Sequence, residues 1–202
     1  MRIAAMFTVV ACMLAAAAVS AATQTFSGRL DDLANTALVA SNLGAPSFAN
    51  SSAVANNVAL YSIFVPVAGA VSVQSFGYAR GGIDPYFTLF RGTGNSASFV
   101  ASNYGQAFAT GGDFIWSGLL PAGNYRLALG VFANLSFAEN LGSGTLADGF
   151  IALGDARFLG NSSYELRATT PVPEPPAAVL LTAGLLALIA PTLLSARQRW
   201  CV

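Results

Sequence analysis

The chain has 202 residues, enough for one domain plus targeting segments, and only 9% of them are charged, against roughly 25% in ordinary soluble domains. Nine arginines balance nine acidic residues, so the formal net charge is zero and no basic surface for nucleic acid is expected. There is no histidine, and the two cysteines lie in the apolar end segments. This excludes a cysteine nucleophile, a Ser–His relay, a His/Cys zinc site and a disulfide framework from the middle of the chain.

Residues 1–22 predict a secretory signal peptide, because one arginine precedes an alanine-rich apolar run that ends in small residues. We expect signal peptidase to remove this segment at Ala21 or Ala22. Two alternatives stay open. One is an uncleaved membrane anchor, and the other is lipidation of Cys12, which follows a stretch that resembles a lipobox.

The middle of the chain, residues 23–170, predicts about eight short β-strands. Segments of four to eight aromatic and aliphatic residues alternate with clusters of Gly, Asn and Pro. In chain order the expected strands are 25–30, 58–65, 70–76, 86–91, 99–102, 113–119, 125–132 and 163–168. The only helical periodicity, in residues 30–39, is poor. The sequence therefore predicts an all-β domain, an antiparallel β-sandwich or jelly roll.

Alternation along three of these strands predicts which side chains face the core. Val71 and Val73 should face it from one strand, and Tyr164 and Leu166 from the last. The clearest alternation lies in 125–132. It places Tyr125, Leu127, Leu129 and Val131 inward and Arg126, Ala128 and Gly130 outward.

The C-terminal segment, residues 171–202, predicts a membrane-associated end. The proline-rich stretch 171–176 should be rigid and extended. Residues 177–194 carry no charge, and a helix of that length spans about 27 Å, close to a bilayer core. The tail 195–202 contains Arg197 and Arg199, which favours a single-pass helix with a cytoplasmic C-terminus.

This order of motif, apolar span and basic tail resembles the PEP-CTERM sorting signal of Gram-negative bacteria. The resemblance implies that Pro173, Glu174 and Pro175 are recognised by an exosortase-like membrane protease. It also implies passage from an inner-membrane intermediate to the cell surface or the extracellular matrix. An ordinary single-pass anchor with a proline-rich stalk is the alternative, and a GPI signal fits less well because the tail is basic.

The middle of the chain resembles the DVUA0089 family of exported proteins, which is similar to bacterial pre-peptidase C-terminal domains. The matching pieces are 60–64, 82–90, 92–95 and 120–129, within a family-like core of 58–168. The resemblance implies a β-sandwich, and its motifs are mostly structural.

Calcium ligands are the only metal chemistry that the middle of the chain suggests. Asp84, which precedes Pro85, is a calcium candidate or a turn residue whose carboxylate accepts local N–H groups. Asp148 and Asp155 flank a Gly-bounded loop and could bind calcium, act as an acid/base pair or simply be solvated.

Three aromatic residues are candidates for a sugar-stacking platform: Tyr78, Tyr104 and Trp116. For Trp116 the alternative is a core or edge position in its strand.

Together these patterns predict an exported bacterial cell-surface or extracellular-matrix protein with a structural or interaction role. The alternative is a carbohydrate- or calcium-binding surface module, with extracellular polysaccharide as the partner. We expect no catalytic residue, no enzyme activity and no obligate cofactor, because no acid/base pair can be assigned by spacing.

Overall fold

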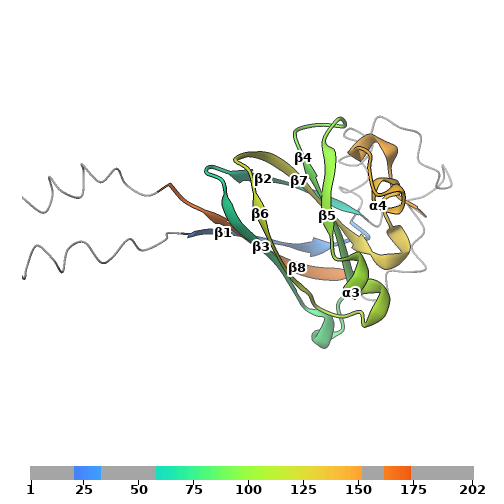
Figure 1. The fold of residues 1–202 in the computed structure, drawn as a ribbon. Helices are drawn as coiled ribbons and strands as arrows, with labels where there is room; N and C mark the ends of the chain where they lie inside the picture. Colours follow the sequence, from blue (N-terminus) through green and yellow to red (C-terminus); the bar gives the residue numbers. More distant parts are fainter. Residues whose placement is uncertain (1–20, 33–57, 152–161, 174–202) are drawn as a thin grey trace, which may run out of the picture. The chain divides into compact units, whose positions relative to one another are not determined.

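Eight strands form two four-stranded antiparallel sheets in the computed structural model, which describes residues 21–32, 58–151 and 162–173 (Figure 1). The strands are β1 (Ala21–Arg29), β2 (Ala59–Val65), β3 (Gly69–Phe76), β4 (Pro85–Arg91), β5 (Ser98–Ser102), β6 (Ile115–Leu120), β7 (Gly123–Val131) and β8 (Ser163–Pro171). Sheet 1 has the order β1-β8-β3-β6, and sheet 2 has the order β2-β7-β4-β5. The predicted all-β sandwich is confirmed, and each predicted strand overlaps an observed one.

The largest difference in strand boundaries is at the start of β1. This strand begins at Ala21, four residues before the predicted strand, and its register pairs Ala21 with Pro171 and Ala22 with Thr170. The side chains of residues 21–25 are small or polar and exposed, so their sequence has no apolar alternation that could mark a strand. Main-chain pairing to β8 forms this part of β1.

The main core fills the space between the two sheets. Phe87 lies at its centre, fully buried, with its ring stacked on Phe114 at 4.8 Å and edge-on to Trp116 at 5.8 Å between centroids. The inward residues of β7 and β8 that the sequence predicted are all buried there: Tyr125, Leu127, Leu129, Val131, Tyr164 and Leu166. Val71 and Val73 join them from β3.

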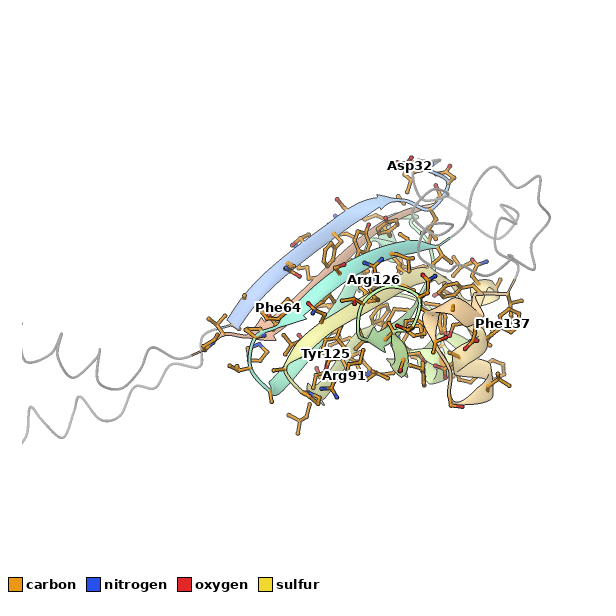
Figure 2. The ribbon with its side chains drawn as sticks, turned by 90° about the horizontal axis from the view of Figure 1, so that it is seen from above. Asp32, Phe64, Arg91, Tyr125, Arg126 and Phe137 are labelled. Carbon is orange, nitrogen blue, oxygen red and sulfur yellow. The ribbon has the colours of Figure 1, made fainter. Side chains whose placement is uncertain are left out.

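A second, smaller core covers the outer face of sheet 2, and it corrects one prediction. Ala128 and Gly130 were expected to face solvent, but both are buried. The chain from 132 to 150 folds over this face with the helices η2 (Phe132–Asn134), α4 (Phe137–Leu141) and η3 (Leu146–Asp148). Ala128 packs there with residues from that segment and from the neighbouring strands: Val58, Leu60, Phe90, Ala97, Ala138, Leu146 and Phe150. Arg126 does lie on the outer side of β7, and its Nη1 donates to the hydroxyl of Ser62 at 2.6 Å (labelled in Figure 2).

One side of the sandwich, between β1 and β2, is closed by aromatic residues. Phe26 stacks on Tyr61 with 4.3 Å between ring centroids. The Tyr61 hydroxyl hydrogen-bonds the hydroxyl of Tyr164 and so connects sheet 2 to sheet 1. Burial raises the pKa of both phenols above the ordinary value, so both stay neutral at physiological pH.

An ion pair between Arg29 and Asp31 stabilises the turn that follows β1. Arg29 donates two hydrogen bonds to Asp31, at 2.9 and 2.8 Å, and the Ser162 hydroxyl donates a third at 2.7 Å from the residue before β8. These donors lower the pKa of Asp31 from 3.8 to about 2.

We expect the stability of the fold to fall in acid partly through Asp31. Its folded pKa lies below its unfolded value, so the carboxylate stabilises the fold above about pH 4 and loses this contribution as the pH falls from about 4 to about 2. Melting temperatures measured across that window should fall more steeply for the wild type than for Asp31→Asn. Ser162→Ala, which removes one donor, should be intermediate. Identical slopes for all three proteins would contradict this assignment.

Candidate functional site

Asp84, the first calcium candidate from the sequence, lies beside the loop around Gly112. Asp84 directly precedes β4, and its Oδ1 accepts the N–H of Gly112 at 2.6 Å. Gly111 has φ of +62°, and a Cβ added there would collide with the Asp84 carboxylate. The carboxylate therefore fixes a loop 28 residues away, instead of accepting from its own turn.

A second carboxylate, which the sequence analysis did not single out, belongs to the same loop and ties it to the end of β3 and the start of η1 (Tyr78–Arg80). Asp113 accepts from the Ser75 hydroxyl at 3.1 Å and from the N–H groups of Gly77 and Tyr78 at 3.2 and 3.1 Å. Residue 113 lies in a bend, and β6 begins two residues later than predicted, at Ile115.

Asp148 is used locally. Its Oδ2 accepts the N–H of Thr145 at 2.7 Å and forms a capping box at the start of η3. Asp155 lies outside the described residues, so the Asp148–Asp155 pair is not placed. Among residues 21–32, 58–151 and 162–173, no three His, Cys, Asp or Glu side chains gather as metal ligands. Calcium binding stays a prediction.

The predicted processing sites flank the sandwich in sequence, at the start of β1 and just after the end of β8. Ala21 and Ala22 are exposed and open β1, and Pro173 is exposed two residues after the end of β8. Glu174, Pro175 and the predicted span 177–194 lie outside the described residues. Within the part of the chain that the structure does describe, no helix is long and apolar enough to cross a membrane.

The predicted aromatic platform is not assembled from its three members. Trp116 lies in β6 and turns its ring inward onto Phe87 of the main core. Tyr78 is exposed in the helix η1 (Tyr78–Arg80), and Tyr104 is exposed in α3 (Tyr104–Ala109). Trp116 is therefore a core-facing residue of an edge strand, which was the alternative left open.

Tyr104 instead joins two other rings in what we call the aromatic cluster, formed by Tyr104, Phe108 and Phe132. The Tyr104 and Phe108 rings are 6° from parallel with 6.1 Å between centroids, and Phe132 lies 5.7 and 5.8 Å from them. Phe108 is 69% exposed and Tyr104 39% exposed. Buried Tyr86 supports the cluster, edge-on to Phe132.

Sequence reasoning missed two of these three rings. Tyr104 and Phe108 are four residues apart, which places them on one face of a helix, but α3 is too short to show a helical period. Phe132 comes from η2, and only folding brings it to α3. Exposed aromatic faces of this kind are suited to the apolar faces of sugar rings.

No protein-family model matches the sequence, and no curated protein matches it at a significant level. Among solved structures, the chain is similar to a periplasmic inhibitor of g-type lysozyme from Aeromonas hydrophila, with 13% identity and a TM-score of 0.37, over 78% of this chain and 90% of the inhibitor. It is also similar to the pre-peptidase C-terminal domain of a collagenase from Bacillus anthracis, with 12% identity and a TM-score of 0.34, over 73% of this chain and 89% of that domain.

Proposed function

We propose that the protein is an exported bacterial surface or extracellular-matrix protein, whose β-sandwich is delivered by removable segments at both ends. The observation that carries this proposal is the pairing of Ala21 with Pro171 at one end of sheet 1 (Figure 1). The sandwich begins at the predicted signal-peptidase site and ends at the start of the predicted sorting motif. Cleavage after Ala22 and beyond Pro173 would remove only two of the nine residue pairs that join β1 to β8.

Pro173, the first residue of the predicted motif, is exposed, which suits recognition by an exosortase-like protease. Each proline of the motif fixes its own φ and keeps the preceding residue extended, the conformation that proteases bind. The β8 pairing ends at Pro171, two residues before the predicted motif, so processing at the motif would leave the paired residues in place.

A structural or binding role, and not catalysis, fits the chemistry available. The sequence has no histidine, and the carboxylates of Asp84, Asp113 and Asp148 are occupied by N–H groups of loops and turns. We therefore assign no catalytic residue and no cofactor.

The delivery proposal predicts the mass and location of the mature protein. In a host that makes an exosortase, the exported protein should lack residues before Ala22 or Thr23 and the segment after the motif, by intact mass. Changing Pro173, Glu174 and Pro175 together to alanine should leave the chain in the membrane fraction with its C-terminal segment. Pro176→Ala, which spares the motif, is the matched control and should be processed normally. A wild-type chain found in the cytosol with both ends intact would refute the proposal.

Carbohydrate binding is a second candidate, and the exposed aromatic cluster is the observation that favours it. Co-sedimentation with insoluble polysaccharides and with the polymer of the producing host tests this candidate. Phe108→Ala should weaken binding about 2- to 12-fold, since one aromatic contact contributes about 0.5–1.5 kcal/mol. Leu141→Ala is the control, because Leu141 is 72% exposed on α4 but lies outside the aromatic cluster, and it should not change polysaccharide binding. Equal loss in both variants, or no binding by the wild type, would count against it.

A further inference from the structure

The strand β6 leaves an open edge on sheet 1. Among the strands of residues 21–32, 58–151 and 162–173, it pairs with β3 alone. Its six residues, Ile115–Leu120, contain no charge and no proline. Native proteins usually protect such an edge with a charge, a proline, a bulge or a covering segment, because the free N–H and C=O groups are a template for another strand. None of the residues of β6 supplies that protection.

The outer face of β6 is also apolar. Leu119 is 84% exposed and Ile115 is 71% exposed, and both side chains point away from the core on either side of Ser117. Ala70 of β3, paired with Leu119, is exposed beside them. On the inner face, the Trp116 ring lies over Gly118, where a Cβ would come within 2.6 Å of it.

The other three edge strands differ from β6. β1 carries mostly small or polar side chains, and it ends in Arg29, which is ion-paired. β5 is covered, because Phe99 donates its N–H to the carbonyl of Gly144. β2 also contains no charge and no proline, but it exposes only one large apolar side chain, Phe64, at 58% (labelled in Figure 2), against two in β6.

The sequence of β6 is complementary to itself. Residues directly opposite in an antiparallel pair lie on the same face of the sheet. If Ser117 lies opposite Ser117 of a second copy, then Ile115 lies opposite Leu119 twice on the outer face. Trp116 then lies opposite Gly118 on the inner face, and each indole stays over the glycine of its own chain. A shift of the partner by two residues that places Ser117 opposite Leu119 would place Ile115 opposite Pro121, beyond the end of β6.

We propose that β6 is a homodimerisation edge, at which two copies pair antiparallel about Ser117 and join their four-stranded sheets into one of eight strands. A pair of six-residue strands gives an interface near or below the roughly 1,200 Å² of stable complexes, so the dimer is weak in dilute solution. Confinement of the chains to one surface raises their effective concentration and favours the dimer. This inference does not depend on the route by which the protein reaches a surface.

Disulfide trapping in the full-length chain tests the proposed register. Cys12 and Cys201 are first replaced by serine, and single cysteines are introduced on exposed positions. Opposed residues of an antiparallel pair have Cα atoms about 4.5–5.5 Å apart, within the range that a disulfide spans. In membranes treated with a mild copper oxidant, the yield of covalent dimer for Ser117→Cys should be at least about fivefold higher than for Phe64→Cys or Ile115→Cys. In an equal mixture, the Ile115→Cys chain should cross-link to the Leu119→Cys chain.

A charge exchange gives a second readout without cysteine. Ile115→Lys or Leu119→Glu alone should abolish the concentration-dependent dimer in sedimentation. Mixing the two variants should restore it, because the ammonium introduced on one chain then lies opposite the carboxylate introduced on the other. Cross-linking at Ser117 no greater than at Phe64 would overturn the proposal. A dimer that persists in Ile115→Lys would also overturn it, because the interface would then lie elsewhere. Failure of the Ile115→Lys and Leu119→Glu variants to associate when mixed would overturn the proposed register.

Discussion

Replacing Phe87 by alanine should lower the free energy of unfolding by about 3–5 kcal/mol, a large part of the 5–15 kcal/mol that is typical of a domain. Phe87 is fully buried at the centre of the main core, where it contacts the rings of both Phe114 and Trp116. Its strand β4 lies inside sheet 2, between β7 and β5, so the neighbouring backbone cannot move in to fill the cavity.

Urea unfolding followed by far-UV circular dichroism measures this effect without relying on the tryptophan beside the site. Phe64→Ala is the matched control, because Phe64 is the same residue type in a strand but is 58% exposed. We expect that control to change stability by no more than about 0.5 kcal/mol. A loss below about 1 kcal/mol in Phe87→Ala, or equal losses in both variants, would contradict the position of Phe87 in the core.

The second large effect should come from Asn103→Leu, which we expect to cost about 2–4 kcal/mol through two unsatisfied main-chain groups. Asn103 is buried directly after β5. Its Oδ1 accepts the N–H of Phe87 at 2.8 Å, and its Nδ2 donates to the carbonyl of Pro85 at 3.0 Å. The last β5 residue paired with β4 is Ser102, opposite Thr88, so the amide of Asn103 continues the ladder where the strand has ended.

Thermal unfolding together with hydrogen exchange distinguishes this role from a loss of packing, since leucine is no smaller than asparagine and leaves no cavity. The amide of Phe87 should lose protection in Asn103→Leu by more than the global destabilisation explains. Asn124→Leu, at an exposed position in β7, is the control and should be nearly neutral. Unchanged hydrogen exchange at the Phe87 amide would show that the side-chain hydrogen bonds of Asn103 do not hold β4 in place.

Alternation of side chains predicted the strands because a strand with one buried face must place every second residue there. For this reason β3, β7 and β8 were predicted with the correct inward residues, such as Val73, Leu127 and Leu166. The start of β1 was missed for the opposite reason. Its side chains are exposed on both faces and carry no periodic signal, although its backbone is paired with β8.

The candidate sites could be predicted only in part. The sequence offered Asp84 as a calcium ligand or a turn residue and Asp148 as a loop carboxylate, but it could not show that the partner of Asp84 is the distant N–H of Gly112. It identified Tyr104 as a surface aromatic residue but grouped it with the wrong neighbours. Hydrogen bonds and ring contacts between residues far apart in the chain leave no local pattern, so spacing cannot reveal them.

The sequence by itself determined the class of fold, because the eight apolar segments and the turn residues between them are local properties of the chain. It also determined that the middle has neither thiol nor imidazole chemistry. Only the tertiary structure decided that the second face of sheet 2 is buried, with Ala128 beneath the segment 132–150. A small residue such as alanine tolerates both solvent and a core, so what covers it depends on where a distant part of the chain folds.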